Sequence, residues 1–159
     1  MTIKPGRSST RRGALVVMLA GLLAVPSLSA GQPTGALRIS HPWARPAMAG
    51  RAGAGYLTIT NTGKAPAMLA GATSPVADRV TIHEMRMNGA VMRMRTLSSL
   101  SIAPGATLTL APGGAHLMLE GLKRDLKPGD RAPLTLTFAG AGQVKVDLVV
   151  ESPAPHHHM

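Results

Sequence analysis

Apolar and polar residues alternate in short runs along most of the chain, and turn residues separate these runs every 8 to 12 residues or so. A period of two is typical of strands that place one face on a core. The pattern predicts a single all-β domain, a sandwich or barrel, with one short helical turn within residues 119–126. The predicted strands are residues 54–60, 68–72, 79–87, 108–110, 115–119, 134–138 and 144–150.

Residues 83–95 predict a β-hairpin. Asn88-Gly89 is a strong signal for a two-residue turn, because a type I′ turn needs positive φ at both central positions. With this loop, His83 pairs with Met94 and Glu84 pairs with Arg93. One face of the hairpin then carries a histidine and four methionines, namely His83, Met85, Met87, Met92 and Met94. The other face is charged and carries Glu84, Arg86, Arg93 and Arg95.

The run at residues 115–120 predicts a strand with one apolar and one chemically active face. Leu117 and Leu119 would point into the core, so His116 and Met118 would point outward. A hairpin that lays its methionine face over this strand would gather two imidazoles and two thioethers. Such ligands suit Cu(I), whereas calcium and magnesium prefer oxygen ligands. The predicted metal ligands are His83, Met94, His116 and Met118. The alternative is that the methionines only fill the core.

The composition narrows the function classes. The chain has no cysteine, which removes disulfides, the usual thiolate ligand for Cu(I) and the thiolate that a blue-copper centre requires. No Ser-His-Asp set or carboxylate pair stands out among the seven acidic residues, so we expect no enzyme. The net charge of +10 is dispersed and only three residues are aromatic, which argues against nucleic acid as a partner. Positive charge instead favours encounters with acidic partner surfaces.

The N-terminus has the features of a cleavable signal peptide over residues 1–30. Four basic residues precede an apolar run at 13–25, and small residues end at Ala30. The run is shorter than the roughly 20 residues that cross a bilayer, so the mature protein has no predicted transmembrane segment. The pair Arg11-Arg12 leaves export by the Sec or the Tat pathway open. The missing cysteine near the cleavage site argues against a lipoprotein anchor.

The predicted domain organisation is therefore a signal peptide (1–30), a metal-binding domain (31–152) and a histidine-containing tail (153–159). The tail is a second candidate site, because imidazole nitrogen suits Cu(II). Its histidines are His156, His157 and His158. A remnant of an affinity tag is the alternative reading of these residues.

The spacing His, ten residues, Met, twenty-one residues, His-x-Met resembles the PCu(A)C family of periplasmic copper chaperones. The similarity extends over residues 38–150 and includes Pro-Trp-Ala-Arg at 42–45 and Pro-Gly-Gly-Ala-His-Leu-Met-Leu-Glu-Gly-Leu at 112–122. It implies a cupredoxin-like Greek-key β-sandwich with His83, Met94, His116 and Met118 as Cu(I) ligands.

The resemblance also implies a role. It points to a periplasmic carrier that hands copper to an acceptor, either a cytochrome c oxidase subunit or another copper chaperone, for assembly of the oxidase copper centres. Two alternatives stay open. One is copper storage or resistance without a dedicated acceptor, and the other is a structural sandwich that binds no metal.

Overall fold

The computed structural model describes residue 2 and residues 34–152 of the chain. The predicted signal peptide, apart from residue 2, and the three tail histidines lie outside the described residues. No helix in the described part is long and apolar enough to cross a membrane. The described elements are η1 Thr34–Ala36, β1 Leu37–Ala44, β2 Gly53–Asn61, β3 Ala67–Thr73, β4 Ala77–Asn88, β5 Val91–Leu97, β6 Leu100–Ile102, β7 Thr107–Leu110, β8 Ala115–Leu122, β9 Arg131–Phe138 and β10 Gly142–Val150.

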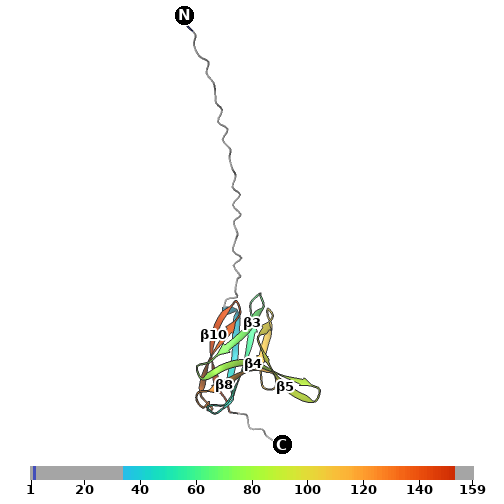
Figure 1. Ribbon diagram of the computed structural model, residues 1–159, viewed down its shortest axis with the longest axis vertical. Helices are drawn as coiled ribbons and strands as arrows, with labels where there is room; N and C mark the ends of the chain where they lie inside the picture. Colours follow the sequence, from blue (N-terminus) through green and yellow to red (C-terminus); the bar gives the residue numbers. More distant parts are fainter. Residues whose placement is uncertain (1, 3–33, 153–159) are drawn as a thin grey trace.

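The strands form one sheet in the order β5-β4-β8-β2-β1-β10-β9-β3-β6, and β7 pairs with β2. A further pairing of β3 with β4, at Ala72 and Val80, closes the sheet on itself. Among the described residues, all strand pairs are antiparallel except β1 with β10. Figure 1 shows the closed body and the end of the β4–β5 hairpin, which projects from one side of it. The prediction of a single all-β domain is confirmed.

The barrel interior is apolar, and β8 shows how the alternation produces it. Leu117 and Leu119 are fully buried among core residues such as Leu57 and Leu148. The residues between them, His116 and Met118, therefore point to the outer face of the sheet. The structure thus agrees with the prediction that the leucines of this strand point into the core and that His116 and Met118 point outward.

Strands β1 and β6 were not predicted, and one expected element is replaced by a strand. The strand β1 is hidden in the sequence because its pairing with β2 is irregular between Ser40 and Trp43, where His41 has φ of 46°. The expected helical turn at residues 119–126 is wrong. There β8 continues in the sheet to Leu122, Gly121 has φ of 63°, and Leu126 pairs with Ala47 in an isolated bridge.

The predicted hairpin register is also wrong. Asn88 pairs with Val91, so the two-residue loop is Gly89-Ala90 and not Asn88-Gly89. Of these two loop residues only Gly89 has positive φ, at 66°, which matches a turn that requires glycine at its first central position. His83 consequently lies opposite Thr96 instead of Met94.

This shift moves every partner by two residues along β5, so each side chain remains on its predicted face. Met94 lies opposite Met85, and Glu84 lies opposite Arg95 instead of Arg93. The hairpin therefore keeps one face of methionines and one of charged residues, although the expected pairs are replaced.

Candidate metal centre

Two histidines on neighbouring strands meet on the outer face of the sheet. His83 on β4 lies directly opposite His116 on β8, and their ring centroids are 5.8 Å apart. Their relative exposures are only 9% and 7%, although their chain neighbours Ile82 and Leu117 fill the core on the other side. Among the described residues the only other buried polar side chain is Asn61. Burial of two imidazoles side by side is costly unless their nitrogen atoms have partners.

The predicted methionine ligands lie on this same face. The Sδ atom of Met94 is 2.9 Å from Nδ1 of His83. Met94 reaches His83 diagonally, because Thr96 occupies the position directly opposite. Met118 follows His116 by two residues on β8 and lies opposite Thr81 of β4. The structure thus brings Met94 into contact with His83, places His116 beside His83, and puts Met118 on the same face.

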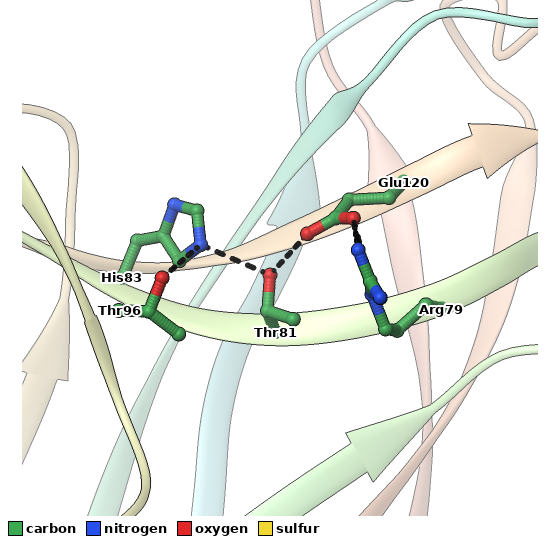
Figure 2. A network of polar contacts seen from close by, with 5 residues as sticks. All are labelled: Arg79, Thr81, His83, Thr96 and Glu120. Carbon is green, nitrogen blue, oxygen red and sulfur yellow. Dashed lines mark hydrogen bonds and ion pairs between the residues drawn. The ribbon is translucent and has the colours of Figure 1, made fainter.

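The hydrogen bonds at Nε2 of His83 favour the tautomer that carries its proton there. The Thr81 hydroxyl donates its single hydrogen to Oε1 of Glu120 at 2.8 Å, as Figure 2 shows. Its oxygen can then only accept, so Nε2–H of His83 donates to it at 3.1 Å. The Thr96 hydroxyl lies 3.2 Å from the same nitrogen. With the proton on Nε2, Nδ1 of His83 carries the free lone pair and faces the Met94 sulfur.

His116 is oriented in the opposite sense. Its Nδ1 lies 3.1 Å from the backbone carbonyl oxygen of Gly114, and a carbonyl only accepts. Nδ1 therefore carries the hydrogen and Nε2 has the free lone pair. Histidines that ligate metals typically donate their other N–H to a carbonyl, a carboxylate or water, which fixes both tautomer and ring orientation.

The hydroxyl of Thr81 connects His83 to an ion pair. Glu120 accepts hydrogen bonds from the Arg79 guanidinium as well as from Thr81 (Figure 2). Both donors stabilise its charged form and hold the pKa of the Glu120 carboxyl below its ordinary value. The pKa of His83 is lowered by burial and by the neighbouring His116, against a smaller opposite influence of Glu120. His83 is thus kept neutral, which is the state that binds a metal.

An aromatic row continues from the histidines across the sheet. The ring of Tyr56 on β2 lies 6.4 Å from that of His116, and the ring of Trp43 on β1 lies 4.5 Å from that of Tyr56. Tyr56 is buried, so this row covers the side of His116 that faces away from the hairpin. Access to the cluster is therefore from the side of Met94, whose relative exposure is 49%.

The described residues contain no group of three or more histidine, cysteine, aspartate or glutamate side chains that could hold a metal. Any ion at this cluster would depend on thioether sulfur for part of its coordination. All four predicted ligands are uncharged when they bind, which suits a soft monovalent cation better than a hard divalent one.

The sequence interpretation missed the residues that support the cluster. Thr81, Thr96, Tyr56 and Glu120 had no assigned role. A usable signal was present, since Thr81 precedes His83 by two residues and therefore shares its face.

Residues 37–150 match a family model described as "LpqE-like: Putative lipoprotein LpqE-like". A protein of Leifsonia xyli subsp. xyli (strain CTCB07), named "Putative lipoprotein Lxx21020", is 35% identical over 122 residues, which cover 76% of this chain and 73% of that protein.

Solved structures show the same fold. The "Copper-bound PCuAC domain from PmoF2" superposes with a TM-score of 0.64 at 30% identity, over 75% of this chain and 95% of that one. The "Solution structure of CuI-DR1885 from Deinococcus Radiodurans" has a TM-score of 0.55 at 34% identity, over 73% and 80% of the two chains. These similarities confirm the expected cupredoxin-like fold.

Proposed function

The chain belongs to the LpqE-like family, which is the PCu(A)C family of copper-binding domains, and on this premise we propose that it carries one Cu(I) ion on the outer face of β4, β5 and β8. The proposed ligand atoms are Nδ1 of His83, Sδ of Met94, Nε2 of His116 and Sδ of Met118.

One observation carries this proposal. The free lone pair of His83 and the sulfur of Met94 converge at 2.9 Å, in a place where both buried imidazoles have their other nitrogen hydrogen-bonded. A purely structural role would not need two buried histidines whose remaining lone pairs have no hydrogen-bond donor among the described residues. The reading of these methionines as core filler also fails for Met94, which is about half exposed.

The ligand set favours Cu(I) over zinc. Zinc sites are built from thiolate, imidazole and carboxylate, and this cluster offers only imidazole from that group. Thioethers remain neutral at every pH and bind soft cations. The ion would keep most of its single positive charge, and Glu120, linked through Thr81, is the nearby carboxylate that offsets it.

The same arrangement supports release of the ion to an acceptor. The imidazoles are held by hydrogen bonds within the sheet, whereas Met94 belongs to the exposed end of a hairpin. We infer that incoming acceptor ligands displace the thioethers first, one at a time, so that copper is never free in solution. A storage protein with the same site would bind copper equally well but would not accelerate its transfer.

The charged face of the hairpin indicates an acidic acceptor surface. Arg86 and Arg93 are direct cross-strand neighbours, although like charges in this position repel. Arg95 adds a third guanidinium, and Glu84 is engaged by Arg86 at 2.6 Å. We propose that this face meets the acidic rim of a copper acceptor in the periplasm, with the copper centres of cytochrome c oxidase as the destination that the family resemblance implies.

Anaerobic titration of the purified protein with Cu(I) against a competing chelator tests the binding proposal. We expect one tight equivalent that zinc does not displace. A zinc affinity equal to or greater than the Cu(I) affinity would overturn the metal assignment.

Transfer kinetics test the chaperone role. The copper-loaded protein is mixed with a metal-free copper domain of a cytochrome c oxidase subunit, and the rate is compared with that from a copper–chelator complex of equal affinity. Faster transfer from the protein supports delivery, and an equal rate supports storage. The double variant Arg86→Glu/Arg93→Glu should transfer more slowly with unchanged Cu(I) affinity, because the substituted face is opposite the ligands.

The tail histidines remain a separate proposal. We infer that His156, His157 and His158 bind Cu(II), because they offer only imidazole nitrogen. Deleting residues 153–159 should abolish a Cu(II) equivalent and leave the Cu(I) equivalent intact.

A further inference from the structure

Methionines continue along the hairpin beyond the proposed Cu(I) site. Met85 lies directly opposite Met94, and Met87 lies directly opposite Met92, all on one face. Opposed side chains on a strand pair have Cβ atoms roughly 5 Å apart. The flexible side chains of each pair can therefore reach a common point. The result is a ladder of two thioether pairs that starts at the histidines and ends at the hairpin loop.

Packing does not explain this ladder. The relative exposures of Met87 and Met92 are 63% and 53%. Four of the six large hydrophobic side chains that are exposed in the described part of the chain lie on this hairpin, and three of them are methionines. The remaining one, Val91, adjoins the loop.

The ladder is attached to the proposed site at its inner end. The backbone carbonyl of Gly114 accepts both the Met85 amide, at 3.2 Å, and the ring N–H of His116. Met94 faces His83 and is also the cross-strand partner of Met85. A thioether that binds copper together with the histidines is thus also the first member of the outer series.

We propose that Met85, Met87 and Met92 form a second, weaker Cu(I) position on the hairpin, from which the ion passes to the histidine site through Met94. Three neutral sulfur ligands are sufficient chemistry for Cu(I) and unsuitable for hard cations. The inference goes beyond the proposed function, because an all-thioether position would bind Cu(I) even if the histidines did not. Passage is simple ligand exchange, in which each new copper–sulfur bond replaces an old one and the ion remains Cu(I).

The surroundings explain why this position would be the weaker one. It has no imidazole, it is open to water, and the opposite face of the same hairpin carries Arg86, Arg93 and Arg95. Positive charge on one face disfavours a cation on the other, although water and salt screen much of this repulsion. Weak binding suits a position that an ion occupies only in passing.

The test uses the purified protein with methyl-¹³C-methionine and Ag(I), a redox-inert probe for Cu(I), followed by Cu(I) itself under anaerobic conditions. The first equivalent should move the methyl resonances of Met94 and Met118. A second, weaker equivalent should move those of Met85, Met87 and Met92. The double variant Met87→Leu/Met92→Leu should lose the second equivalent and keep the first.

The matched control is Met48→Leu/Met68→Leu, which removes two exposed methionines outside the hairpin and should keep both equivalents. The inference is overturned if the hairpin double variant retains the second equivalent, if no second equivalent is seen, or if it moves Met48 and Met68 as much as the hairpin methyls. The proposed function fails separately, if the first equivalent leaves the ring resonances of His83 and His116 unchanged.

Discussion

The barrel and the projecting end of the β4–β5 hairpin use the same alternation of side chains for different purposes. Within the barrel, alternate residues of β8 are buried apolar residues, and Leu117 and Leu119 have no exposed surface. On the hairpin, the six residues Val91–Thr96 of β5 are all exposed, so neither face of that strand segment is buried. On the hairpin, the alternation places methionine side chains on one face and charged side chains on the other, instead of separating core residues from solvent-exposed residues.

Strand β4 belongs both to the barrel and to the projecting hairpin. The first half of β4 contributes Val80 and Ile82 to the core, whereas residues from Arg86 to Asn88 are exposed. His83 lies at the point of change, buried by its neighbours yet in contact with a hairpin methionine. The comparison indicates that stability comes from the barrel, and that the hairpin is shaped by its ligand chemistry.

The largest expected effect tests this division directly. Leu117→Ala should lower the free energy of unfolding by about 2–5 kcal/mol, because it leaves a cavity in the core. Met87→Ala should change it by no more than about 0.5 kcal/mol, because the side chain is mostly exposed. Denaturant unfolding of the metal-free proteins measures both. A cost above about 1.5 kcal/mol for Met87→Ala would show that the hairpin packs on the barrel.

Met94→Leu separates stability from copper binding at the junction. The substitution conserves volume, so the free energy of unfolding should change by less than about 1.5 kcal/mol. Loss of the sulfur should reduce Cu(I) affinity by at least the roughly tenfold that loss of a ligand's supporting partner costs, measured by competition titration. Met68→Leu is the matched control and should bind normally. Unchanged binding by Met94→Leu would remove Met94 from the ligand set.

Thr81→Val tests the support of His83 and has a smaller expected effect. The hydroxyl that accepts from Nε2 is removed while the shape of the side chain is conserved. Partners of ligating histidines contribute about tenfold or more to metal affinity, so a loss of about tenfold is expected. Thr109→Val, on an exposed position of β7, should leave the affinity unchanged. An unaffected affinity in Thr81→Val would mean that Thr81 does not orient the ligand.

The pH dependence is the mildest effect. The pKa of His83 is lowered by burial and by His116, so protons compete for its nitrogen only below the ordinary imidazole value of about 6.5. Cu(I) affinity should therefore weaken as the pH falls below that range. For the metal-free protein, the unfolded chain takes up the proton first. The stability that His83 contributes is thus present above about pH 6.5 and lost as the pH falls through its lowered folded-state pKa.

Competition titrations between about pH 8 and pH 5 measure the copper effect. An affinity that does not change over this range would argue that neither histidine is a ligand.

Most of the fold could be predicted from the sequence, because the alternation of apolar and polar residues shows which face of a strand is buried. The prediction was wrong where the local sequence allows more than one turn. Asn88-Gly89 and Gly89-Ala90 are both plausible loops, and the choice is made by strand pairing along the whole of β4 and β5. The predicted ligands still lie on one face, because the two loops differ in register by two residues and each side chain therefore keeps its face. Residues such as Thr81 escaped notice because a threonine in a strand is ordinary, and only its bonds to His83 and Glu120 make it informative.

X-ray absorption of the protein loaded with one equivalent of Cu(I) identifies the atoms that bind the ion. We expect copper bound by two sulfur and two nitrogen atoms, with one nitrogen lost in His116→Ala and one sulfur lost in Met94→Leu. A copper environment without sulfur, or one that is unchanged in both variants, would contradict this expectation.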